Sequence, residues 1–434
     1  MAGTAKRETT TLSGVEAMLV SLVQELRDPP VTGPGRPRVL PNALLWSSLV
    51  LAIVQGKTSQ SAVWRMVCDR DIWRSHAVSV SDQAVFKRLG VTGPSPMEAL
   101  FTQLTAVLLD RVTPYQDLTL APFAAEIVAL DQSTLDPIAR TLPSLRGAGP
   151  TDHALLPGKL AGVYDIRKRL WRQIQLIPNP DQPEKVAAPA LIADLPKGSL
   201  ILADMGYFSF AWFDHLTDTG HYWISRVPSP VKLQVRHTLH DEEYADDLGM
   251  LGAHRSHKAK HLVRRVQYTS PQGTHTYLTN ITDPALLSVQ EIAVLYGRRW
   301  DIEQAFKLVK RDLNLHMLWS AKPTVIAHQV WAVLLIAQML QFLQVEIAAR
   351  AGVPVDDVSL SLLVAYLPAY AARADDALSA YIRDARHLRF IRPSRRITPR
   401  APTVALDRFT PPPADLVRTQ NPRYGKPNRE RTVK

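Results

Sequence analysis

The stretch Tyr296–Lys310 constrains this chain more than any other, because it predicts an α-helix with two stripes of opposite character. At about 100° per residue, one stripe holds a phenol, an acid and three cations: Tyr296, Arg299, Glu303, Lys307 and Lys310. A second stripe is apolar and comprises Ile302, Phe306, Val309 and Leu313. Such a helix is anchored in a core and presents a carboxylate among phosphate-binding groups. The pattern also fits an exposed helix in which Glu303 and Lys307 form an ordinary i,i+4 ion pair.

Two carboxylates upstream favour a catalytic interpretation of that helix. Asp131 and Asp204 each end an apolar run that is typical of a buried strand, and ligands meet an α/β sheet at such strand ends. Either Asp can instead cap the turn that follows it. Three carboxylates suit Mg²⁺, which prefers oxygen ligands and, as a pair of ions, assists in-line phosphoryl transfer. We therefore predict that Asp131, Asp204 and Glu303 are catalytic and bind Mg²⁺, which Mn²⁺ can replace.

Composition favours a protein that acts on nucleic acid. A net charge of +11 over 434 residues indicates a polyanionic partner. The single cysteine, Cys68, excludes an internal disulfide and a cysteine-based zinc site. The amino terminus lacks the apolar core of a signal peptide, and the apolar stretch Val330–Ile347 is interrupted by Gln and Glu. These features predict a soluble cytoplasmic protein without a membrane partner.

The periodicity changes along the chain and predicts four regions. Residues 1–120 show helical spacing and are expected to form a DNA-binding domain. Within it, the segment 59–89 fits either a helix-turn-helix variant that offers Lys87 and Arg88 to DNA or a plain helical bundle. Residues 121–350 mix strands and helices, with a β-rich insertion at about 206–287, so the fold class is α/β. A helical region, 351–388, and a basic Pro/Arg-rich tail, 389–434, follow; composition predicts that the tail is mostly disordered.

Three motifs in order give the chain a resemblance to bacterial insertion-sequence transposases of the DDE type. Tyr296, Arg299, Glu303 and Lys310 match the Tyr-x2-Arg-x3-Glu-x6-Lys signature of one subgroup. The two Asp motifs of the family appear as Asp131-Gln-Ser-Thr and Asp204-Met-Gly-Tyr-Phe. The similarity covers roughly residues 80 to 345. One departure is Met205, which stands where the family often has Arg.

The resemblance implies a ribonuclease H-like catalytic core after an all-helical N-terminal domain, and Mg²⁺-dependent cleavage and strand transfer at transposon ends. It also implies that Asp131, Asp204 and Glu303 are the metal ligands and that Tyr296, Arg299 and Lys310 hold DNA phosphates, with Lys307 beside them. The expected partners are the terminal inverted repeats and target DNA, bound by a homodimer. Some relatives stack a flipped base on an aromatic ring, for which Trp223 is a candidate; a buried core tryptophan fits equally well.

Two alternatives remain open from the sequence. One is a metal-dependent DNA nuclease of similar core that cuts without joining. The other is a catalytically inactive or domesticated DNA-binding relative. The presence of all three acids favours an active enzyme over the second alternative.

Overall fold

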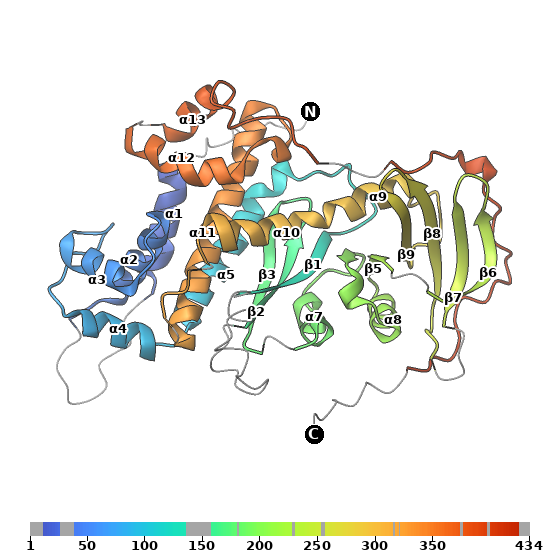
Figure 1. Ribbon diagram of the computed structural model, residues 1–434, viewed down its shortest axis with the longest axis horizontal. Helices are drawn as coiled ribbons and strands as arrows, with labels where there is room; N and C mark the ends of the chain where they lie inside the picture. The colour runs from blue at the N-terminus through green and yellow to red at the C-terminus, as the bar shows by residue number, and fades with distance from the viewer. Residues whose placement is uncertain are drawn as a thin grey trace, which may run out of the picture.

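Figure 1 shows the computed structural model of the protein, an elongated molecule with helices at one end and a large sheet extending to the other. The structure describes residues 12–26, 39–135, 158–179, 182–227, 231–252, 257–315, 317–320, 322–373, 376–396 and 400–424. The described α-helices are α1 Leu12–Gln24, α2 Asn42–Val54, α3 Gln60–Asp69, α4 Asp82–Val91, α5 Ser95–Val112, α7 Glu184–Ile192, α8 Phe210–Asp218, α9 Val289–Arg298, α10 Trp300–Lys307, α11 Pro323–Ala351, α12 Leu360–Arg373 and α13 Ala377–Ala385. The architecture is mixed α/β, as the sequence predicts.

Nine strands form one mixed sheet in the order β3-β2-β1-β4-β5-β9-β8-β7-β6. Their bounds are β1 Ile127–Thr134, β2 Lys159–Asp165, β3 Leu170–Ile177, β4 Leu200–Ala203, β5 Tyr222–Arg226, β6 Leu233–His240, β7 Ala245–Leu251, β8 Leu262–Ser270 and β9 Gly273–Thr279. The strands β1, β4 and β5 run parallel, whereas all other neighbours pair antiparallel. The β-rich insertion therefore continues the central sheet through the β5–β9 pair.

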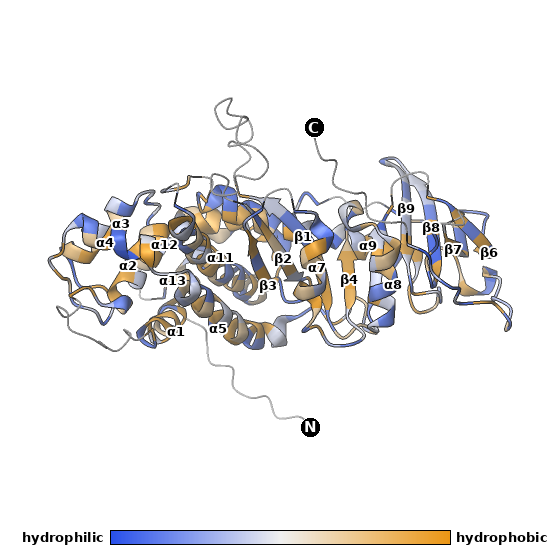
Figure 2. Cartoon of the chain, turned by 90° about the horizontal axis from the view of Figure 1, so that it is seen from below, coloured by the Kyte–Doolittle hydropathy of each residue, from blue (hydrophilic) through white to orange (hydrophobic). Residues whose placement is uncertain are grey.

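Alternate side chains of the central strands pack into two different cores, because successive residues of a strand point to opposite faces. In β1, Ile127 and Ala129 join the core that contains α5, α9, α10 and α11. Val128 and Leu130 join the core that contains α7 and α8. In Figure 2, β3 and β4 carry the hydrophobic colour along most of their length. Asp131 follows the parity of Ile127 and Ala129, so it lies on the face covered by α10.

The helix predicted over Tyr296–Lys310 belongs to a longer helical segment, which is not one straight cylinder. Ser288 and Glu291 form a capping box that starts α9. The helix breaks at Arg299 before α10 begins, and its last turn, Leu308–Asp312, is a π-helix. Both irregularities shift side chains away from the ideal 100° spacing.

The long helix α11 is apolar enough to cross a membrane, yet 83% of its apolar window is buried inside the protein. Its glutamines are hydrogen-bonded to the elements around it. Gln338 binds both the backbone N–H and the C=O of Trp171 on β3, Gln341 donates to the Tyr164 hydroxyl, and Gln344 donates to the carbonyl of Val358. The amides that interrupt this stretch thus fasten α11 to its neighbours.

The expectation of a disordered tail is wrong for residues 389–396 and 400–424, which lie against α9 and α10 and along the β6–β9 part of the sheet (Figure 1). The backbone of Thr419 pairs with His261, and that of Arg423 with Lys258. Phe409 and Leu416 cover a small apolar cluster on the insertion. Composition alone favours disorder, but this packing and pairing offset the cost of ordering the chain. Residues 425–434 lie outside the described part.

Candidate active site

Asp131 lies in β1 where its pairing with the parallel strand β4 ends, and Asp204 is the residue that follows β4. The β1–β4 register pairs Leu130 with Ala203, so each acid is the next residue along its strand. The Asp131 side chain is 15% exposed. Because neighbouring parallel strands place successive pairs side by side, the two acids occupy one edge of the sheet.

Glu303 reaches the same region from α10, and Arg299 links it to Asp131. The Arg299 guanidinium lies 2.5 Å from Glu303 Oε1 and 3.8 Å from Asp131 Oδ2. The i,i+4 pair on this helix is therefore Arg299–Glu303, not Glu303–Lys307. Two guanidinium atoms of Arg299, Nε and Nη1, are buried without a hydrogen-bond partner, which leaves donors available to an anion.

Burial and the neighbouring acids make the Asp131 carboxyl harder to ionise than a free aspartate. Burial raises the pKa of Asp131 to about 7, opposed by the Gln132 N–H and Arg299 and reinforced by Asp204 and Glu303. All three predicted acids thus share one electrostatic environment. Burial disfavours the ionised form of this carboxyl, and a bound cation would stabilise that form.

Both acids that end strands also make local turns, as the capping interpretation expects. Asp204 Oδ1 accepts the Gly206 N–H at 2.7 Å, and Asp131 Oδ1 accepts the Gln132 N–H at 2.8 Å. Each carboxylate has a second oxygen outside these bonds. Capping and a role in the site are therefore compatible.

Lys310 and Tyr296 of the signature lie beside the acids, whereas Lys307 of the same predicted stripe does not. Lys310 Nζ donates to Ser133 Oγ at 3.0 Å, next to the end of β1. The Tyr296 ring lies under the Arg299 guanidinium at 5.7 Å, and burial raises the pKa of its hydroxyl to about 12. Lys307 instead lines the neighbouring pocket described below.

Trp223 is not available for stacking on a flipped base, so that prediction is wrong. Its side chain is 1% exposed and stacks on Phe213 of α8 at 4.1 Å between ring centroids. Its indole N–H donates to Thr217 Oγ1. Because both faces of β5 are buried, the strand pattern did not distinguish an outward ring from a core ring.

The two N-terminal residues proposed for DNA contact differ in exposure. Lys87 is exposed on α4, whereas Arg88 is half-buried and donates to Asn42 Oδ1 at 2.5 Å. Lys87 therefore remains the more accessible of the two. The geometry of α3 and α4 leaves both the helix-turn-helix and the bundle interpretations open.

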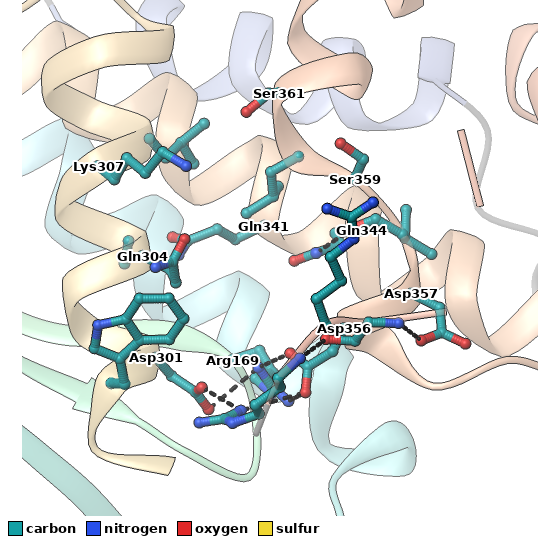
Figure 3. A pocket seen from close by; sticks show the side chains of 18 of the residues that line it. Arg169, Asp301, Gln304, Lys307, Gln341, Gln344, Asp356, Asp357, Ser359 and Ser361 are labelled. Atoms are coloured by element: carbon teal, nitrogen blue, oxygen red, sulfur yellow. Dashed lines mark hydrogen bonds and ion pairs between the residues drawn. The ribbon is translucent and has the colours of Figure 1, made fainter. Parts of the chain in front are cut away.

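A cavity of about 470 Å³ lies on the other side of α10, between α11, the segment 356–361 and the first part of the tail (Figure 3). Its floor is an ion network in which Arg169 and Arg396 contact both Asp301 and Asp356. Arg298 also binds Asp301, at 2.8 Å. Since Asp301 is two residues from Glu303, this network fixes the helix that carries the acid.

The network is expected to contribute stability that is lost in acid. Burial alone would raise the pKa of Asp356, but Arg169 and Arg396 hold it at about 2. A depressed carboxyl pKa stabilises the fold above the unfolded value near 3.8 and loses that contribution as pH falls. We expect Asp356→Asn to lower the free energy of unfolding by about 2 kcal/mol at neutral pH, and by less below about pH 4. Denaturant titrations of Asp356→Asn and of Asp357→Asn, its neighbour outside the network, measure this; a pH-independent difference contradicts it.

The donor set fits a magnesium ion by chemistry, although the side chains are not gathered around one. Among the described residues, no three His, Cys, Asp or Glu side chains stand close enough together to hold a metal ion. Arg299 contacts two of the predicted ligands and takes the place of a cation between them. The carboxylate oxygens are the hard ligands that Mg²⁺ prefers.

One acid near this site escaped the sequence analysis. Glu184 begins α7, and its charge acts on Asp204 and on Tyr207. The Pro183-Glu184 pair is typical of a helix start, yet Pro189 inside α7 and the Pro-rich segment around it concealed the helix. The position of Glu184 beside Asp204 arises from tertiary packing.

Residues 136–340 match the protein family described as "Transposase DDE domain". The match contains Asp204 and Glu303 and begins just after the strand that carries Asp131. Among solved structures, the cryo-EM structure of a piggyBac transposase synaptic complex with hairpin DNA is similar at a TM-score of 0.40 and 10% identity, over 90% of this chain and 83% of that one. A likeness of this size carries no information about function. No protein with a curated description matches the chain.

The family match places a transposase DDE domain at residues 136–340. It confirms the predicted function of DNA transposase, an enzyme that cleaves and transfers DNA. Enzymes of this class use divalent metal ions.

Proposed function

We propose that this protein is an insertion-sequence transposase of the Tyr-Arg-Glu-Lys subgroup, built on a ribonuclease H-like core. Asp131, Asp204 and Glu303 hold Mg²⁺, with Mn²⁺ as a substitute. The observation that carries the proposal is the convergence of Asp131 and Asp204 at one sheet edge with Glu303, which Arg299 ties to Asp131. The order β3-β2-β1-β4-β5, with helices on both faces, supports the assigned core.

The chemistry is an in-line displacement at phosphorus. In cleavage a water oxygen bonds to phosphorus and the bond to the 3′ oxygen breaks; in strand transfer the freed 3′-hydroxyl attacks a target phosphate. When bound, divalent cations activate the attacking oxygen and stabilise the leaving one. Arg299 and Lys310 bind the phosphates beside the acids, and the Tyr296 hydroxyl donates to them. Three further basic residues contact the duplex at a greater distance from the reacting phosphate: Lys307 on α10, and Lys87 and Arg88 in the N-terminal helices.

We further propose that the partners are the terminal inverted repeats and target DNA, bound by a homodimer in the cytoplasm. The net charge of +11 supports a DNA partner. Division of the chain into an N-terminal helical domain at 1–120, a catalytic domain at 121–350 and a helical region at 351–388 fits the change from helices to sheet near Ile127.

The test uses purified protein and duplexes that end in the element's own terminal sequences. We expect cuts at the element ends with Mg²⁺ or Mn²⁺ and none with EDTA, because the acids alone cannot stabilise the leaving oxygen. A pre-cut end with a free 3′-hydroxyl should be joined to plasmid DNA. Cutting without joining would indicate a nuclease, and binding without cutting an inactive relative; either result contradicts the proposal.

A further inference from the structure

Glu184 lies over the candidate active site rather than on an open helix end. Gln132, the residue after Asp131, donates from its side-chain amide to the Glu184 carbonyl at 3.1 Å. Lys159 on β2 donates to the carbonyl of Gln182, just before the helix. The first turn of α7 is therefore fastened to the strands that end at the acids.

Gly206 shows where the Glu184 carboxylate is directed. A Cβ added to Gly206 would collide with Glu184 Oε2 and would lie 3.0 Å from Asp204 Oδ1. The two carboxylates thus face the same small space, which is open because residue 206 has no side chain. This accounts for a glycine in the Asp204-Met-Gly-Tyr motif.

The charges of Lys159 and Lys185 act on Glu184 from a distance, but within the described residues no cationic side chain is bound to the pair that it forms with Asp204. Neither side chain forms an ion pair with any residue of the described part of the chain, whereas Asp131 and Glu303 share Arg299. Glu184 Oε2 is buried and has no hydrogen-bond partner. Two facing carboxylates without a cation are costly, so this half of the site suits a positive ligand.

Tyr207 gives an independent indication of a ligand at the same place. Its side chain is fully buried, and its hydroxyl makes no well-formed hydrogen bond, although the Gln132 side chain lies beside it. Burial, followed by the charges of Glu184, Asp131 and Asp204, raises the pKa of that hydroxyl well above its usual value. A buried donor without a partner beside three acids is expected where a further polar group completes the site.

An acid at the first position of a helix has an ordinary explanation, since it offsets the positive end of the helix dipole. That role explains why an acid stands at this position. It does not account for a buried, unpaired oxygen directed at Asp204.

We infer that Glu184 is a fourth carboxylate ligand, which shares with Asp204 a divalent cation of the active site. The inference rests on the proposed function, because it needs Asp204 to hold metal. It changes the ligand set from three acids to four and assigns α7 a part in the site.

Calorimetric titration of the full-length protein with Mn²⁺, without DNA, tests this independently of catalysis. We expect Glu184→Gln to weaken binding by roughly 10- to 100-fold, while Asp194→Asn, an exposed acid beyond the other end of α7, binds as the wild type does. Circular dichroism verifies that both variants are folded. Unchanged Mn²⁺ affinity in Glu184→Gln, with loss in Asp204→Asn, overturns the role of Glu184 alone. Unchanged affinity in both variants overturns the metal site of the proposed function.

A second measurement needs no variant. Fe²⁺ with ascorbate and peroxide cleaves the backbone next to bound iron, so the wild-type protein should yield fragments cut near residues 131, 184 and 204. Excess Mg²⁺ should suppress all of these cuts. Cuts near 131 and 204 without any near 184 contradict the inference.

Discussion

Asp131→Asn is expected to reduce cleavage of element ends by roughly 10³-fold, equivalent to about 4 kcal/mol of transition-state stabilisation. Asparagine keeps the size of the side chain and can still accept the Gln132 N–H. What it removes is the charge that binds a cation at the end of β1. Because the carboxyl is largely buried and burial raises its pKa to about 7, its removal should leave the folded state as stable as before, or more so.

Asp165→Asn is the matched control for this variant. Asp165 is a buried acid at the far end of β2, and burial raises its pKa to about 6, but it lies outside the site. It should retain cleavage within about threefold, since no ligand or phosphate contact is lost. Gel assays of end cleavage, filter binding and thermal unfolding separate the effects. Equal losses in both variants would mean that burial of charge, not catalysis, explains the result.

The three acids that we propose as catalytic could be predicted because each is marked by a local sequence pattern. Asp131 and Asp204 end apolar runs, and the strand register then determines that they meet. Glu303 is marked by the periodicity of its helix. These patterns depend on neighbours within a few residues, which is the range over which sequence spacing predicts structure.

Other features depend on residues far apart in the chain and left no such signal. Trp223 is buried because Phe213 of α8 packs on it, and the ordered tail depends on an apolar cluster of the insertion. Glu184 reaches the site only because α7 packs over β1 and Gly206 leaves room. Strand β7, which is buried on both faces, also escaped prediction because its sequence lacks alternation.

The π-turn at the end of α10 shows how a correct prediction can place a side chain incorrectly. Ideal spacing puts Lys307 and Lys310 on one stripe with Glu303. In the structure Lys310 binds Ser133 beside the acids, while Lys307 lines the adjacent pocket. A single irregular turn thus separates two cations that the sequence groups together.

Arg299→Gln is expected to move two measurements in opposite directions. Cleavage should fall by about 10²-fold, because the guanidinium whose Nε and Nη1 lack partners is the group placed to bind the phosphate. Affinity for Mn²⁺ in the absence of DNA should rise, because the cation that contacts Asp131 and Glu303 is removed from the place where a metal ion competes with it.

Arg311→Gln removes the same charge from an exposed position on the same helical segment and should change neither quantity by more than about twofold. A purely structural role for Arg299 predicts something different: loss of its contacts would disorder Glu303, and Mn²⁺ affinity would fall together with cleavage. Calorimetry and end cleavage on the same preparations therefore distinguish the two roles by sign. Parallel losses would show that Arg299 acts through the position of Glu303, and unchanged cleavage would exclude it from the phosphate site altogether.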